Sequence, residues 1–329
     1  MKIGLFTDVL QDLSFADALD WAAGQGIEAV EIGAGNFSNA PHCDVDRLLN
    51  DADARARFKD AIESRGLTLS ALNCNGNLLD PHPERGKKSQ GTFFKTVEAA
   101  NRLGLDTIVT MSGCPGDPTG GEYPNWVTCA WQREFVELGE RQWAEVIEPF
   151  WKKAGRFAAD RGVKIAIEMH PGQSVYNTRC LLRLRDVAGP GIGANLDPSH
   201  LFWQGMDPLV VVRALGRNGV FHVHAKDTWI DPQEMALNGG LDTRPPSVSP
   251  PHAGGTKGAG ERSWTFRTVG YGHGAAWWRD FVSTLRLMGY DGVLSIEHED
   301  RLMGSREGIV KSVEFLRPIV LKTTAEGWI

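Results

Sequence analysis

Eight short apolar segments alternate with longer segments of helical periodicity along the whole chain. The short segments are rich in Val, Ile and Leu, which is typical of strands that a parallel sheet buries on both faces. We predict strands at residues 3–9, 27–32, 67–73, 107–111, 164–169, 192–196, 220–225 and 293–297. Eight strand–helix units in 329 residues match the number that closes a (β/α)8 barrel. The pattern therefore predicts an α/β protein, a (β/α)8 TIM barrel, with one domain over residues 1–329.

Glycines mark the ends of several predicted helices. Gly26, Gly66, Gly104 and Gly162 each follow a helical segment, where a left-handed residue commonly ends a helix. The predicted helices are 15–25, 46–65, 92–103, 133–161, 178–187, 208–215, 275–288 and 305–320. We expect the fourth to be divided near Pro149. An open doubly wound sheet is the alternative architecture, but the turn at residues 7–14 lacks the GxGxxG motif that binds a dinucleotide.

The connections after the fourth and seventh strands are longer than a barrel requires. They cover residues 114–132 and 228–274, and connections above about 15 residues are usually functional lids or disordered segments. Because both follow strands, both belong to the face on which such barrels carry their active sites. We expect the first to act as a lid. The second contains a Pro-rich stretch at 245–251, which is equally typical of a flexible tip.

The composition argues against several classes of protein. The formal net charge is −6 and no basic run is present, so we expect no nucleic-acid partner. No segment reaches the roughly 18 apolar residues of a membrane span, and the N-terminal residues lack the layout of a signal peptide. Five cysteines without CxxC spacing argue against a disulfide framework or a thiolate zinc site. We expect a cytoplasmic globular protein, and the sequence leaves open whether it forms a homo-oligomer.

Polar side chains with the chemistry of ligands or acid–base groups follow the last four predicted strands. They are Glu168 and His170, Asp197 and His200, His222, His224 and Lys226, and Glu297 and Glu299. Side chains two positions apart on a strand share a face, so these sets should converge over the barrel axis. Three clustered carboxylates repel one another and raise their pKa values, whereas a divalent cation removes that repulsion. The pattern predicts one divalent metal ion, with Mn²⁺ favoured and Co²⁺, Mg²⁺ or Zn²⁺ as alternatives.

The order of these motifs resembles that of the xylose isomerase-like TIM barrels, especially the sugar isomerase and epimerase branch related to ketose 3-epimerases. The resemblance rests on Ile167-Glu168, Leu196-Asp197-Pro198-Ser199-His200, His222-Val223-His224 and Ser295-Ile296-Glu297. It implies that the metal ligands are Glu168, Asp197, His224 and Glu297, and that His200 binds substrate. An arginine that these epimerases carry shortly after the strand-seven histidine has no counterpart here, where Thr228-Trp229-Ile230 stands. This departure leaves the identity of the substrate open.

The resemblance also implies a function. It indicates a metal-dependent sugar isomerase or epimerase that acts on a ketose or keto-sugar through a metal-bound enediolate. The ion would acidify the C–H bond next to the carbonyl, with Glu168 and Glu297 as base and acid on opposite faces. The other side chains, expected to hold hydroxyls or help to move protons, are His170, His200, His222 and Lys226.

Two alternatives remain open at this point. The same enediolate can expel a leaving group, which would make the protein a lyase or hydratase that cleaves a 3-keto-glycoside by β-elimination. The long connections leave room for such a larger substrate. The non-enzymatic alternative is an inactive sugar-binding barrel, although all four implied metal ligands are present. In each case the expected partner is a small-molecule sugar or keto-glycoside.

Overall fold

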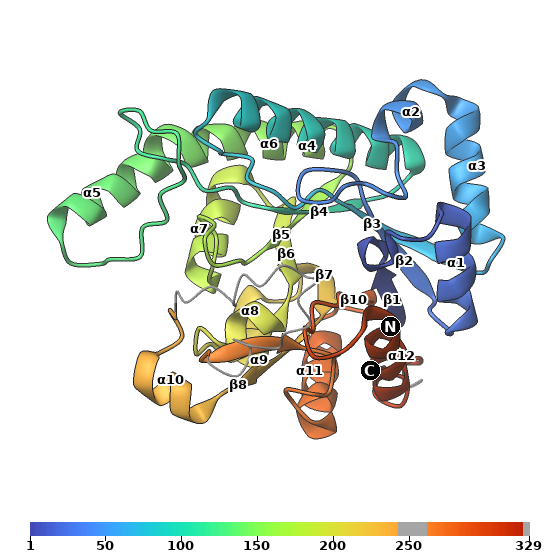
Figure 1. Cartoon of the computed structure of the whole chain (residues 1–329). Helices are drawn as coiled ribbons and strands as arrows, with labels where there is room; N and C mark the ends of the chain where they lie inside the picture. Colours follow the sequence, from blue (N-terminus) through green and yellow to red (C-terminus); the bar gives the residue numbers. More distant parts are fainter. Residues whose placement is uncertain (243–261, 325–329) are drawn as a thin grey trace.

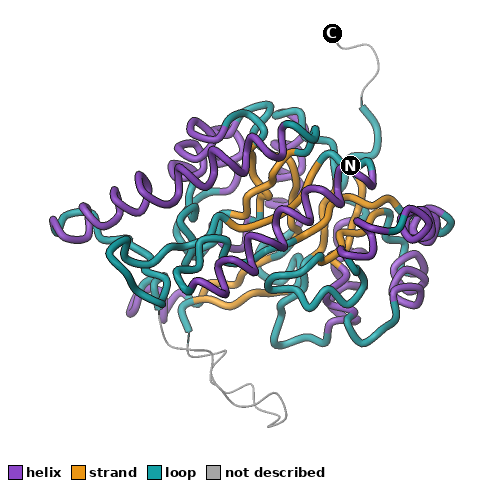
Figure 2. Tube along the Cα trace, turned by 90° about the horizontal axis from the view of Figure 1, so that it is seen from above, coloured by secondary structure: helices purple, strands orange, loops and turns teal. Residues whose placement is uncertain are grey.

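Eight parallel strands close into a barrel in the order β1-β10-β7-β6-β5-β4-β3-β2. The computed structural model describes residues 1–242 and 262–324. The barrel strands are β1 (Lys2–Phe6), β2 (Ala29–Gly33), β3 (Thr68–Asn73), β4 (Thr107–Met111), β5 (Lys164–Glu168), β6 (Ile192–Leu196), β7 (Val220–Ala225) and β10 (Val293–Ile296). Helices surround these strands, as Figures 1 and 2 show. The predicted (β/α)8 barrel is confirmed, and every predicted strand overlaps an observed one.

Twelve α-helices lie in the described part of the chain. They are α1 (Phe15–Gly24), α2 (Val45–Asn50), α3 (Ala52–Glu63), α4 (Pro83–Leu103), α5 (Arg133–Gln142), α6 (Glu148–Ala159), α7 (Thr178–Ala188), α8 (Pro198–Phe202), α9 (Pro208–Leu215), α10 (Pro232–Asn238), α11 (Ala275–Leu287) and α12 (Ser305–Leu316). None of them has the length and apolar character needed to cross a membrane.

Two predicted helices differ from the observed ones for local reasons. The segment 46–65 is divided at Asp51, whose backbone is extended and whose side chain accepts a hydrogen bond from the Ala54 N–H. Asp51 therefore ends α2 and caps α3. The segment 133–161 is divided near Pro149, as predicted, into α5 and α6, but a π-helical turn rather than an irregular break separates the two helices, and Pro149 lies in the first turn of α6. The π-helical turn, Trp143–Ile147, precedes α6. It contains the carbonyl of Glu145, with which the ring of Pro149 would collide in a regular α-helix.

The two long connections differ in structure. Residues 115–130 run without regular secondary structure and lead into α5, which extends away from the barrel in Figure 1. The connection after β7 instead builds a small antiparallel sheet from β8 (Asp227–Ile230) and β9 (Trp264–Arg267). The indole ring of Trp264 stacks on that of Trp203, with ring centroids 4.5 Å apart. The Pro-rich stretch at 245–251 lies outside the described residues.

Asp227 anchors the return of this second connection to the barrel. Its carboxylate is fully buried. Oδ2 accepts hydrogen bonds from the backbone N–H groups of Gly270, Gly272 and His273 and from the indole N–H of Trp278. Oδ1 accepts a further hydrogen bond from the backbone N–H of Thr228 and lies 2.8 Å from His273 Nδ1. One side chain therefore fixes the segment that joins β9 to α11.

Candidate metal centre

Four side chains from consecutive strands converge at the carboxyl end of the barrel. Glu168 ends β5, Asp197 follows β6, His224 lies in β7 and Glu297 follows β10. One ligand atom from each lies within 4.8 Å of the others. His224 Nδ1 is 3.4 Å from Glu168 Oε2 and 3.2 Å from Glu297 Oε2. The structure thus brings together the four residues that the sequence motifs select.

Hydrogen bonds hold two of these carboxylates in place. Glu168 Oε2 accepts bonds from the side-chain amides of Asn75 and Asn195, at 2.8 and 3.1 Å. Asp197 Oδ1 accepts the Ser199 N–H at 2.9 Å and so caps the short helix α8. In both cases the remaining carboxylate oxygen lies near His200 Nε2, at 3.2 and 3.3 Å.

Two buried atoms of the cluster make no aligned hydrogen bond within the described structure. They are Asp197 Oδ2 and His224 Nδ1. The cluster holds three carboxylates and Lys226 pairs with two of them, Asp197 and Glu297, so negative charge is in excess in a buried site. A divalent cation would supply the missing charge and a ligand contact for both atoms. The donor set of carboxylate oxygens and one imidazole nitrogen therefore fits such an ion.

Lys226 lies at the edge of the cluster. Its Nζ is 3.0 Å from Asp197 Oδ2, 2.5 Å from Glu297 Oε2 and 3.1 Å from Glu299 Oε2. Burial lowers the pKa of Lys226, but the surrounding carboxylates outweigh burial and raise this pKa well above its ordinary value. The lysine is therefore a cation held against two of the candidate ligands.

His170 and His200 form a pair beside the cluster. Their ring centroids are 4.1 Å apart, and His170 lines a cavity that opens next to the cluster. Burial, followed by the neighbouring charges of His170 and Lys226, lowers the pKa of His200 well below its ordinary value. A neutral His200 retains one N–H to donate to a carboxylate or to a hydroxyl group.

His222 lies deeper in the barrel, where the sequence predicted a substrate contact. Its Nδ1 is 3.1 Å from Asn195 Oδ1, and its Nε2 is 3.7 Å from Glu31 Oε2. The ring is buried and is not among the residues that line the cavity. Its substrate-binding role therefore stays a prediction that no cavity contact supports.

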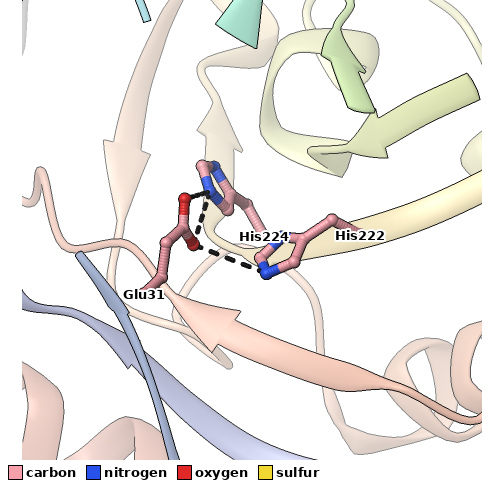
Figure 3. A group of neighbouring side chains, drawn as sticks. All are labelled: Glu31, His222 and His224. Carbon is pink, nitrogen blue, oxygen red and sulfur yellow. Dashed lines mark hydrogen bonds and ion pairs between the residues drawn. The ribbon is translucent and has the colours of Figure 1, made fainter. Parts of the chain in front are cut away.

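Sequence analysis missed Glu31, a fully buried residue of β2. Figure 3 shows its carboxylate facing His224 and His222. Both Glu31 oxygens lie 3.1 Å from His224 Nε2. Burial raises the pKa of Glu31, but the two histidines and hydrogen bonds from His224 and Ser295 outweigh burial and lower this pKa to about 2. The available signal was a charged residue flanked by Val30 and Ile32 in an apolar strand.

The cavity next to the cluster has a volume of about 470 Å³. The residues that line it are Phe6, Asp8, Val9, Gln11, Phe37, Ser38, Asn73, Asn75, Met111, His170, Glu297, His298, Glu299 and Ser305. Asp8, also missed by sequence analysis, has one buried oxygen without a hydrogen bond, and burial raises the pKa of its carboxyl group. A Cβ atom at Gly33 would collide with Asp8 Oδ1 and with Ser38 Oγ. Glycine at this position therefore makes room for the Asp8–Ser38 pair.

Comparisons with known proteins agree with this architecture. The uncharacterised protein YfiH of Bacillus subtilis (strain 168) is 41% identical over 323 residues, which cover 97% of this chain and 99% of that protein. An inosose dehydratase of Clostridium beijerinckii is 25% identical over 234 residues, or 70% of each chain. The crystal structure of the IolI protein with a bound zinc atom is similar in fold, with a TM-score of 0.64, 17% identity, and coverage of 97% of this chain and 98% of that one.

A family model described as a xylose isomerase-like TIM barrel matches residues 19–319, which is most of the chain. The closed parallel barrel and the family match support the same assignment. The protein therefore belongs to the xylose isomerase-like TIM barrel family.

Proposed function

We propose that this protein is a divalent-metal-dependent sugar epimerase or isomerase, which removes a proton next to a carbonyl group of a keto-sugar and returns it. The proposal rests chiefly on the convergence of Glu168, Asp197, His224 and Glu297, with two buried atoms of this set left without hydrogen bonds. The zinc atom bound to IolI, a protein of similar fold, adds support for a metal ion but does not identify the ion in this protein.

The residues of the cluster would divide the chemistry between them. When bound, a divalent cation polarises a carbonyl oxygen and stabilises the negative charge that develops on it. Glu168 and Glu297 follow different strands, and each places a carboxylate oxygen within 3.4 Å of His224 Nδ1. One carboxylate would take the proton from the carbon next to the carbonyl, and the other would return a proton to the opposite face. Glu297 lines the cavity, so it has direct access to substrate.

The neighbouring groups would hold the substrate. His170 lines the cavity and would contact a hydroxyl group directly, while His200 behind it would donate to a hydroxyl or to Glu168. Lys226 hydrogen-bonds to Glu297 and Glu299, which would keep the Glu297 carboxylate oriented.

A second candidate reaction, elimination of water or of a glycosidic leaving group, is favoured by the similarity to an inosose dehydratase. After removal of the same proton, the C–O bond at the next carbon breaks, and the leaving oxygen must take up a proton. Asp8 lines the cavity, and burial raises the pKa of its carboxyl group, so it suits the role of proton donor. Epimerisation and elimination therefore share the first step and differ in the second, which either returns a proton to carbon or breaks the C–O bond.

Solvent exchange tests the step that both reactions share. In D₂O, protein loaded with Mn²⁺ is expected to place deuterium on the carbon next to the carbonyl of a converted keto-sugar. The panel should contain a free ketose, an inosose and a 3-keto-glycoside, each followed by NMR, which also separates an epimer from an elimination product. EDTA should abolish the exchange. Conversion to an epimer or isomer without deuterium in substrate or product would contradict carboxylate-mediated proton transfer and would indicate hydride transfer. An elimination product need not carry deuterium, because no proton returns to that carbon when the C–O bond breaks.

The cavity lining leads to an expectation about substrate charge. Two carboxylates, Glu297 and Glu299, line this cavity, and among the described residues no Lys or Arg lines it. A phosphate group would meet like charges there, which weakens binding. We therefore expect a free keto-sugar to have a kcat/KM at least about tenfold higher than its phosphate ester. Steady-state kinetics on such a pair measures this ratio, and a preference for the ester would contradict a neutral substrate.

A further inference from the structure

We propose that Glu31 is a positioning residue for His224, which it holds through Nε2 so that Nδ1 faces the metal ion. The inference rests on the proposed function, because it requires a metal ion at the four-residue cluster. It assigns a role to a residue of β2, on the side of the barrel that carries none of the four candidate ligands.

The two nitrogens of His224 have different surroundings. Nε2 lies 3.1 Å from both oxygens of Glu31. Figure 3 shows the Glu31 carboxylate facing this side of the His224 ring. Nδ1 lies within 3.4 Å of Glu168 and Glu297 but makes no aligned hydrogen bond. A carboxylate can only accept a hydrogen bond, so Nε2 carries a proton, and Nδ1 would present its lone pair to a bound metal ion. Ring nitrogens that bind metals are oriented in this way by a carboxylate on the opposite nitrogen.

Glu31 is itself held in a fixed orientation. Ser295 Oγ donates to Oε2 at 2.7 Å, and the Asn73 side-chain amide donates to Oε1 at 2.7 Å. Ser295 is also the residue of β10 that pairs with His224 of β7. Both oxygens of Glu31 are therefore anchored, one on the strand next to that of His224 and the other on β3.

The same network continues to a second candidate ligand. Asn73 Oδ1 accepts the backbone N–H of Asn75, at 2.8 Å. The side-chain amide of Asn75 donates to Glu168 Oε2, also at 2.8 Å. A chain of hydrogen bonds thus links Glu31 to Glu168 through Asn73 and Asn75. Burying a carboxylate costs free energy. The hydrogen bonds of the buried Glu31 orient two proposed metal ligands, His224 directly and Glu168 through the two asparagines.

A separate metal site is the main competing explanation, because Glu31, His222 and His224 also lie close enough together to share an ion. The hydrogen bonds favour positioning instead. Ser295, Asn73 and His224 already occupy the Glu31 oxygens, and His222 Nε2 is 3.7 Å away, beyond hydrogen-bond distance. The number of ions bound per chain distinguishes the two explanations.

The test measures Co²⁺ binding by the full-length protein, without any substrate. Wild-type protein is expected to bind one Co²⁺ per chain. Glu31→Gln should weaken Co²⁺ affinity by about 10- to 100-fold and should change the visible d–d spectrum at saturation, because the imidazole loses its charged partner. The matched control is Glu28→Gln, the same change in a partly exposed residue that pairs with Lys322 at the other end of the strand. It should leave both measurements unchanged.

Further outcomes separate this inference from the proposed function. Equal affinity and an unchanged spectrum in Glu31→Gln would overturn the positioning role while leaving the metal site intact. Two ions in the wild type and one in Glu31→Gln would assign Glu31 to a separate metal site. No Co²⁺ binding by the wild type would overturn the proposed function and this inference with it. If Glu31→Gln does not fold by circular dichroism, Ser295→Ala removes only one bond to Glu31 and should weaken affinity by a smaller factor.

Discussion

Replacing Glu168 or Glu297 by Gln is expected to lower kcat by about 10³-fold or more, because each carboxylate is assigned both metal binding and proton transfer. An amide cannot accept the proton from carbon, and it is a poorer ligand for a divalent cation. Steady-state kinetics on the substrate identified by solvent exchange provides the measurement. Wild-type kcat in Glu168→Gln would show that this carboxylate is not the proton-transfer group.

His200→Ala is the matched comparison for these two variants. His200 lies beside Glu168 and Asp197 but is assigned a hydrogen bond to substrate rather than proton transfer. Loss of an interaction that is equally strong in the ground state and the transition state raises KM. Loss of an interaction made only in the transition state lowers kcat. We therefore expect this variant to raise KM more than it lowers kcat. A fall in kcat as large as that of the glutamate variants would place His200 in the chemical step.

Asp227→Ala is expected to reduce the free energy of unfolding by about 3–5 kcal/mol, because it removes the shared acceptor of several buried or partly buried donors at once. The backbone N–H groups of Gly270, Gly272 and His273 would lose their partner, as would the indole N–H of Trp278. Urea titration at constant m-value measures the change.

The control for this prediction is Asp280→Ala, an exposed aspartate on α11. Surface substitutions of this kind usually change stability by less than about 0.5 kcal/mol. A loss below about 1 kcal/mol in Asp227→Ala would mean that water or a rearranged loop satisfies the freed donors.

Sequence reasoning located the barrel and its candidate ligands for the same physical reason. A strand buried on both faces is a continuous apolar run, and the residues at its end are the first to reach a polar environment. Glu168, Asp197 and Glu297 each stand at such a point, so the pattern in the sequence and the geometry in the barrel coincide. The helix boundary at Asp51 was harder to predict from the sequence, because the acidic residues around it are equally typical of the exposed surface of a helix.

The order of the barrel strands, and the polar residues that follow the last four of them, were predicted from the sequence because apolar runs and their ends are local features. The choice of Glu168, Asp197, His224 and Glu297 among those residues rested on the resemblance to the family. The contact between Glu31 and His224 was decided only by the tertiary structure, since these residues lie 193 positions apart and on different strands of the closed barrel. Asp8 likewise joins the cavity wall only when β1 lies between β2 and β10. Strand periodicity determines which side a residue faces, but barrel closure decides which residues meet there.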